Sequence, residues 1–253
     1  MTDFGFSLTY KDEETRGGVL WESHCHACFE LIAVFEGEVT LTLEGRKTTL
    51  QGGSVTVVPP LVYHTVAVNE NAHYRRATVL FDLTALPLPL KERFIARAQS
   101  GNPLYSSDLE RLQKVAPRAN DEFYRPLAES LLTELLYEYT EAKETEKRDA
   151  LDLFLRKTLE YIDAHLCEKI SLDELSLHAA CSKSSLCHRF HEKMGVTVKQ
   201  YVIEKRMALA YKMMHEGGSP TAVATAVGYE NYSNFYRIYQ KRFGEAPSAT
   251  KKA

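Results

Sequence analysis

Histidine, cysteine and glutamate side chains crowd one short stretch near the N-terminus, SHCHACFELIAVFEG, which runs from Ser23 to Gly37. These residue types bind transition metals, and side chains two positions apart on a strand lie on the same face. A strand here predicts one shared face that carries His24, His26, Cys28 and Glu30. Cys25 then faces the other way. The pattern predicts a metal site, with an organic effector pocket or no effector at all as the alternatives.

The sequence around this stretch is typical of a β-rich domain followed by helices. Short β-branched and aromatic runs separated by glycine extend from about Phe4 to Leu83, and Glu44 to Arg46 predicts a hairpin turn. The pattern after Pro89 is helical. We therefore predict an α+β multidomain protein: a β-barrel over 1–85, trailing helices over 86–141, a charged linker over 142–150 and an all-α domain over 151–253.

One of the trailing helical segments has a strong apolar stripe. Its members are Leu127, Leu131, Leu132, Leu135, Leu136 and Tyr139. Such a stripe must be covered, either by the chain's own barrel or in part by a second copy in a homodimer.

Composition limits the classes of protein. The chain has 253 residues, 44% hydrophobic and 26% charged, as in ordinary soluble domains. No apolar run is long enough to cross a bilayer, and five cysteines form no paired spacing, so we expect a cytoplasmic protein that contacts no membrane. From position 151 onward there are 15 basic and 11 acidic residues, although the whole chain has a net charge of -3. The C-terminal part is therefore expected to be the one that approaches a polyanion.

Two stretches of the C-terminal part, 170–195 and 219–244, share one layout. Each has a serine start signal, a short helix, a tight break and a second helix ending at glycine. The positions are Ser171, Ala180 and Gly195 in the first and Ser219, Gly228 and Gly244 in the second. Two helices joined by a sharp turn form a helix-turn-helix, whose second helix fits the major groove. The helix predicted between them, Val196 to Glu216, is long enough to place both units in successive grooves of double-stranded DNA.

At these residues the sequence resembles the AraC (arabinose-operon regulator) family of bacterial transcription factors. The resemblance covers about Ile170 to Ser248 and includes SLDEL, VATAVGY and SNFYRIYQKRFGEAPS. It departs at Ser176 and Arg189, where apolar residues are usual. It implies sequence-specific DNA binding, transcriptional control that is usually activation through RNA polymerase, and an effector-binding or dimerising N-terminal domain.

Helical spacing selects the side chains that face DNA. Leu186 and Phe190 mark the buried face of the first reading helix, and Phe235 and Tyr239 that of the second. The positions left for DNA are Lys183, Ser184, Cys187, His188 and His191 in the first helix and Tyr232, Ser233, Tyr236, Arg237 and Lys241 in the second. Arg237 is the strongest candidate for base readout, because its fork matches O6 and N7 of guanine.

The N-terminal stretch resembles the first cupin motif, and Gly53, Pro59 and His64 resemble part of the second. The second motif departs at Leu61, where glycine is expected, and at Val68, where asparagine is expected. The resemblance implies the metal ligands His24, His26, Glu30 and His64. Three imidazoles and a carboxylate suit Zn, Ni, Fe, Mn or Cu. An organic effector would instead be lined by Trp21, His24, His26, Glu30, Tyr63 and His64.

The function expected from these observations is a DNA-binding regulator, not an enzyme, whose cupin-like domain senses a small molecule or metal ion. The competing class is a metal-dependent cupin enzyme with a helical accessory domain, which would need open coordination positions and a mouth wide enough for a substrate.

Overall fold

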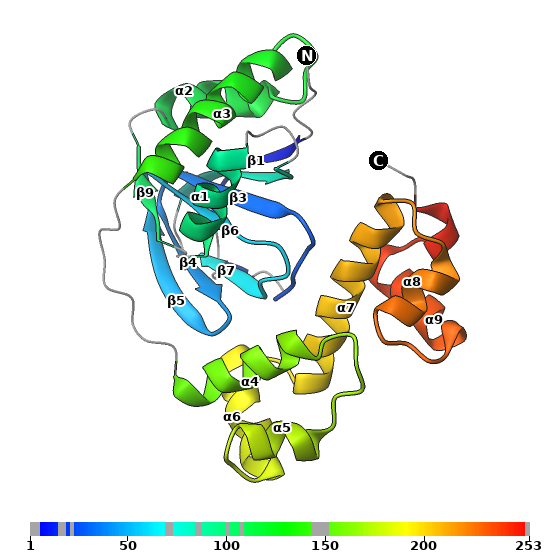
Figure 1. Cartoon of the computed structure of the whole chain (residues 1–253). Coiled ribbons are helices and arrows are strands. Elements are labelled where there is room, and N and C mark those ends of the chain that lie inside the picture. The colour runs from blue at the N-terminus through cyan, green and yellow to red at the C-terminus, as the bar shows by residue number, and fades with distance from the viewer. Residues whose placement is uncertain are drawn as a thin grey trace. The chain divides into compact units, whose positions relative to one another are not determined.

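The computed structural model describes residues 6–14, 19–20, 23–68, 73–83, 88–99, 102–106, 109–142 and 152–250 (Figure 1). The chain divides into two compact units, one built mainly from residues up to Arg148 and the other mainly from Asp149 onward. The predicted linker, 142–150, lies almost wholly outside the described residues.

The first unit contains two antiparallel sheets. The described strands are β1 (Phe6–Glu14), β2 (Val19–Leu20), β3 (Phe29–Glu36), β4 (Glu38–Leu43), β5 (Arg46–Gln51), β6 (Ser54–Val58), β7 (His64–Val68), β8 (His73–Phe81) and β9 (Leu104–Tyr105). One sheet has the order β1-β8-β3-β6-β9 and the other β2-β7-β4-β5. Among the described strands the two sheets do not join into a closed barrel, so the predicted barrel is corrected to two facing sheets.

Alternation along the strands gives the larger sheet two buried faces. Leu31 of β3 and Val79 of β8 point toward the helices, whereas Ile32 of β3 packs against Leu41 and Val66 of the second sheet. The predicted hairpin is present: Leu43 pairs with Arg46, and the residues between them have positive φ angles. The interior between the sheets is therefore a defined face, occupied by alternate side chains of each strand.

Helices cover the other face of the larger sheet (Figure 1). They are α1 (Leu88–Ala98), α2 (Leu109–Val115), the 3-10 turn η1 (Ala116–Arg118) and α3 (Arg125–Glu141). The apolar stripe of α3 packs in the same core as β3, β6 and β8, which confirms that the chain's own sheet covers it. Leu127 is the exception in this stripe, because 45% of it is exposed. Phe123, which precedes the helix, is 81% exposed.

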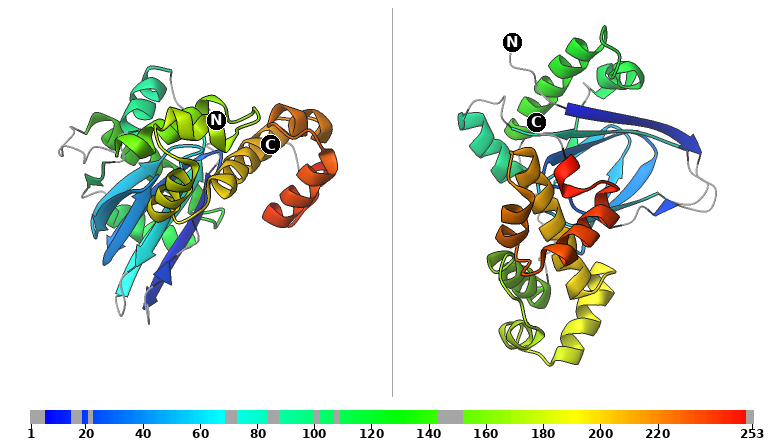
Figure 2. Two further views of the ribbon diagram at one scale, coloured as in Figure 1. Left: turned by 90° about the horizontal axis from the view of Figure 1, so that it is seen from below. Right: turned by 90° about the vertical axis from the view of Figure 1, so that its right-hand side faces the viewer.

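The second unit is helical. Its elements are α4 (Leu153–Ala164), α5 (Leu172–His178), α6 (Lys183–Met194), α7 (Val198–His215), α8 (Pro220–Ala226), α9 (Tyr232–Phe243) and the 3-10 turn η2 (Pro247–Ala249). α7 runs from the α4–α6 group to the α8–α9 group (Figures 1 and 2). It spans 18 residues, fewer than the predicted segment, because Thr197 and Gln200 form a capping box that fixes its start.

Local signals in this unit agree with the sequence. Ser171 and Glu174 form a capping box at α5, and Ser219 caps α8. Gly195 and Gly244 end α6 and α9 in the left-handed conformation. The two helix-turn-helix units therefore begin and end as their sequences predict.

Candidate effector site and DNA-binding helices

Four side chains of the predicted metal site lie together. His24, His26, Glu30 and His64 each offer one ligand atom, and all four atoms lie within 4.8 Å of one another. Around an ion with metal to nitrogen distances of about 2.0 to 2.1 Å, opposite ligands are about 4 Å apart and neighbouring ones about 3 Å. Small side-chain adjustments would bring the cluster to these separations.

The route by which these residues meet differs from the prediction. β3 begins at Phe29, so Glu30 is on a strand, but His26 lies on an irregular segment and His24 makes an isolated bridge. His64 is the first residue of β7, in the opposite sheet. The shared strand face predicted for this stretch was wrong, and the cluster instead depends on a loop and two facing strands.

Hydrogen bonding fixes the orientation of the His64 ring. Its Nδ1 lies 2.9 Å from the carbonyl oxygen of Val62. Since a carbonyl oxygen can only accept, Nδ1 is the donor, and in the neutral ring Nε2 carries a lone pair. Nε2 lies 2.9 Å from Oε2 of Glu30, in a setting where Glu30 is 7% and His64 2% exposed. Two acceptors at this distance need a proton or a cation between them.

The structure describes all but one of the remaining candidate residues near the effector site. Tyr63 is buried beside His64 in the chain, and Cys25 is buried as well. Cys28 is half-buried but is not part of the cluster of four, so its predicted place as a further ligand on the same face is not supported. Trp21 lies outside the described residues.

The backbone at Leu61, where the second cupin motif has glycine, adopts an unusual conformation. Leu61 has a φ of +61°, in the left-handed region, within the turn closed by the hydrogen bond from Val62 to Pro59. A glycine adopts this conformation without steric cost, whereas leucine does not. Leu61 therefore adopts a backbone conformation that favours glycine, the residue expected here from the resemblance.

The first reading helix, α6, presents the expected face. Leu186 and Phe190 are buried. Every residue predicted to face DNA on this helix is exposed, namely Lys183, Ser184, Cys187, His188 and His191. Lys183 forms an ion pair with Asp173 at 2.5 Å, so DNA would compete with that carboxylate for it.

Arg189 has a structural place that the sequence did not reveal. Its guanidinium lies over the Phe154 ring, 3.9 Å from the centroid, and 3.6 Å from the carboxylate of Asp152. Lys193 contacts the same carboxylate at 3.1 Å. The polar residue at an apolar position is therefore accommodated by stacking and charge pairing on α4.

The second reading helix, α9, follows the same pattern. Phe235 and Tyr239 are buried. Tyr232, Ser233, Arg237 and Lys241 are exposed, and Tyr236 is half-buried. Nη2 of Arg237 donates to Oδ1 of Asn234 at 3.2 Å, a contact that orients the guanidinium along the helix surface. The exposed residues of α6 and α9 are thus available to a groove, while their apolar faces hold the unit together.

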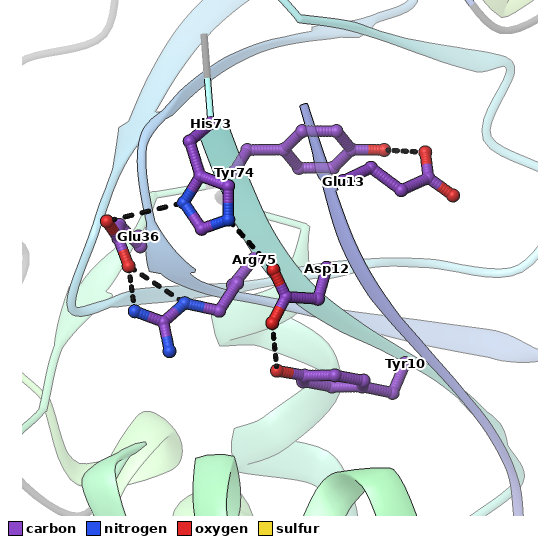
Figure 3. A network of polar contacts seen from close by, with 7 residues as sticks. All are labelled: Tyr10, Asp12, Glu13, Glu36, His73, Tyr74 and Arg75. Atoms are coloured by element: carbon purple, nitrogen blue, oxygen red, sulfur yellow. Dashed lines mark hydrogen bonds and ion pairs between the residues drawn. The ribbon is translucent and has the colours of Figure 1, made fainter. Parts of the chain in front are cut away.

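Sequence reasoning missed two features of the first unit. Arg76 on β8 is only 8% exposed, and no local pattern in the sequence distinguishes it from the neighbouring Arg75. His73 bridges Asp12 and Glu36, and Arg75 also pairs with Glu36 (Figure 3). That network joins residues 61 positions apart, so nothing in local spacing indicates it.

Comparison with known proteins addresses the identity of both units. Residues 13–137 match the model of the AraC-like ligand binding domain, and residues 175–253 match that of a helix-turn-helix domain. The chain belongs to the AraC family. Its members are DNA-binding transcriptional regulators, so the first unit is an AraC-type ligand-binding domain and the second is the DNA-binding domain.

Two curated AraC-family relatives extend over most of the chain. The probable transcriptional regulator LumQ of Photobacterium leiognathi is 27% identical, and the match covers 83% of this chain and 87% of LumQ. The arabinose operon regulatory protein of Escherichia coli (strain K12) is 22% identical over 84% of this chain and 76% of its own length. Among solved structures, ToxT from Vibrio cholerae O395 is 11% identical, with a TM-score of 0.45, and covers 96% of this chain and 95% of its own.

Within the part of the chain that the structure describes, no helix combines the length and the apolar character needed to cross a bilayer.

Proposed function

We propose that this AraC-family regulator is an activator whose DNA binding responds to a divalent transition metal ion. The observation that supports this most directly is the cluster of three imidazoles and one carboxylate within 4.8 Å. His24, His26, Glu30 and His64 would hold the ion. Zn, Ni, Fe, Mn and Cu all accept such a ligand set.

Burial and hydrogen bonding favour a cation here over a polar contact alone. A carboxylate removed from water is costly unless positive charge compensates it. Glu30 is buried, and His64 faces it with the nitrogen that lacks the proton in the neutral ring. A hydrogen bond from the second nitrogen of a ligating histidine to a backbone carbonyl is also the usual way in which such rings are oriented. A bound ion would contact both groups at once.

Metal analysis tests the proposal. Protein purified without a histidine tag should contain close to one equivalent of metal, and the double variant His24→Ala with His26→Ala should lose most of it. His73→Gln is the matched control, because His73 belongs to the same domain but lies outside the cluster. Equal and negligible metal in the unmodified protein and the double variant would refute metal binding.

Regulation requires a second measurement. Titration of labelled operator DNA, with sites selected from a randomised duplex pool, should give different dissociation constants for metal-loaded and metal-free protein. The double variant should behave like metal-free protein under both conditions. A regulator that binds DNA alike in all these states would use a different signal, even if it binds metal.

The proposal also includes activation of transcription, the partners of the protein and its location in the cell. We place the protein in the cytoplasm because its DNA is there, and we expect it to recruit RNA polymerase instead of catalysing a reaction. Leu127 and Tyr137 of α3 and Phe123 in the turn before it expose apolar surface, which favours a homodimer through this helix. A promoter reporter decides between activation and repression, and sedimentation of Leu127→Glu beside the unmodified chain tests the dimer.

A further inference from the structure

Arg76 occupies an unusual place in the ligand-binding domain. It lies on β8 between Tyr74 and Thr78 in the alternation, on the face that points between the two sheets, because Ala77 and Val79 face the helices. Its side chain is 8% exposed. A guanidinium is rarely buried unless it has an electrostatic task, since desolvation of a charge is costly.

The strand register places this guanidinium on the same face as the proposed metal ligands. Arg76 is paired with Val34 of β3, Thr78 with Ile32, and Leu80 with Glu30. Arg76 and Glu30 therefore lie on neighbouring strands two interior positions apart, a separation that a long arginine side chain can shorten. The polar interior positions Thr56 and Thr78 lie on the strands beside Ile32. This part of the interior combines positive charge, hydroxyl groups and the four-residue cluster.

Graded burial indicates how a ligand could enter. The residues of β1 that share the interior face, Ser7 and Thr9, are exposed, because Phe6 and Leu8 belong to the core on the helix side. Thr78 on the next strand is half-buried, and Glu30 on the strand after that is buried. The interior face is thus open to solvent at its β1 edge and becomes buried toward the cluster.

Electrostatics favours additional negative charge beside Arg76. Burial lowers the pKa of its guanidinium, an effect that outweighs the opposing attraction of Tyr74, Glu30 and Glu13. Tyr74 is mostly in its neutral form at ordinary pH, since burial raises its pKa to about 12. The neighbouring groups therefore supply less stabilisation than the guanidinium loses on burial.

We propose that the effector of this domain includes a small organic carboxylate, whose two oxygens pair with the guanidinium fork of Arg76 in the interior between the sheets. The planar fork of arginine matches a carboxylate in two parallel hydrogen bonds, which a neutral sugar does not offer. The inference rests on the interior being the effector site of the proposed function. It adds the chemical class of the effector, and metal and carboxylate would then be sensed together.

Calorimetry on the full chain tests this with named probes. Pyruvate, malate and benzoate represent small carboxylates, and glycerol and arabinose represent neutral polyols. At least one of the three acids should bind the metal-loaded protein and raise its unfolding temperature, whereas the polyols should bind more weakly. Because Arg76→Gln removes a charge-assisted pair, it should weaken the binding of that acid by about tenfold to a hundredfold.

Arg75 provides a matched control. It is adjacent to Arg76 but belongs to the opposite face, where it pairs with Glu36 (Figure 3). Arg75→Gln should bind the acid as the unmodified chain does. Arg76→Lys keeps the charge but loses the fork, so it should bind the acid with intermediate affinity. It replaces Arg76→Gln as the test variant if Arg76→Gln does not fold. Circular dichroism establishes that each variant is folded.

The outcomes separate this inference from the proposed function. If none of the three acids binds, or if Arg76→Gln and Arg75→Gln bind the acid equally well, the carboxylate proposal is overturned while the metal content is unaffected. If the acid depends on Arg76 but metal analysis finds no metal, the carboxylate site stands and the metal signal is refuted.

Discussion

Arg206 of α7 donates from Nη1 to the carbonyl oxygen of Gly228 at 3.0 Å, across the turn between α8 and α9. Its Nε donates to the carbonyl of Leu166 at 2.7 Å and its Nη2 to that of Glu168 at 2.5 Å. One guanidinium thus connects the long helix, the turn of the second helix-turn-helix and the loop after α4. The junction holds the loop before the first helix-turn-helix against the turn of the second.

Gly228→Ala should destabilise the DNA-binding domain. Gly228 has a φ of +85°, and a Cβ there would lie 2.5 Å from the carbonyl oxygen of Cys167. Left-handed strain of about 1 to 2 kcal/mol adds to the steric overlap, so we expect a loss of at least about 2 kcal/mol in the free energy of unfolding. Urea unfolding followed by circular dichroism measures it.

The first helix-turn-helix supplies the control for this experiment. Ala180 occupies the corresponding turn with a φ of +53°, so Ala180→Gly should relieve strain and leave the protein as stable as before or up to about 1 kcal/mol more stable. A destabilisation of similar size in both variants would show that backbone conformation is not the cause.

Arg237 and Lys241 of α9 should affect DNA binding in different ways. Arg237→Ala should relax specificity at one base pair, because a bidentate contact to guanine contributes about 1 to 3 kcal/mol of discrimination. Lys241→Ala should weaken all sequences alike and make the dependence of affinity on salt less steep, as loss of a phosphate contact does. Competition binding on operator variants at two salt concentrations distinguishes them. A uniform loss in both variants would assign Arg237 to the phosphate backbone.

The sequence predicted those parts of the fold that depend on local signals. Serine caps, the glycines that end α6 and α9, and the hairpin at Glu44 to Arg46 are determined within a few residues, so their spacing is sufficient. The buried stripe of α3 was equally visible, since 3.6-residue periodicity reflects burial directly.

Contacts between distant segments were harder to predict. The four side chains that the cupin spacing assigned to a metal lie close together, but the strand assumed to carry His24 and His26 is an irregular segment. Closure of the sheets depends on pairing between strands far apart in the chain, which no local pattern specifies. Arg76 was missed for the same reason, because its significance comes from the opposite strands and not from its neighbours.

The network around His73 should make the stability of the ligand-binding domain depend on pH (Figure 3). Hydrogen bonds to Asp12 and then Glu36 raise the pKa of His73 above 6.5, so its contribution is complete below about pH 6.5 and is lost as pH rises through the folded value. The contact with Arg75 lowers the pKa of Glu36 below 4.5, so that contribution is complete above about pH 4.5 and is lost in stronger acid.

The two signs together predict that the contribution of the network to the free energy of unfolding is greatest between about pH 4.5 and 6.5. His73→Gln should remove the decline on the alkaline side and leave the acid limb. The imidazole titration followed by NMR gives the folded pKa directly. An unshifted imidazole would show that the exposed network is screened by water and contributes nothing.

The packing of the first reading helix, α6, should depend on pH through the carboxyl group of Asp152. Its side chain accepts a hydrogen bond from the backbone of Phe154 and pairs with Lys193 and Arg189, and these contacts lower the pKa of its carboxyl group. A lowered pKa contributes stability above the unfolded value, and the contribution is lost as pH falls through the folded value. Hydrogen exchange should therefore show α4 and α6 opening more often in acid, and Asp152→Asn, which retains an N-cap acceptor, should reduce the pH dependence without abolishing the helix. An unchanged exchange profile in that variant would show that Asp152 acts as a cap alone and that its pairing with Lys193 does not hold α6 in place.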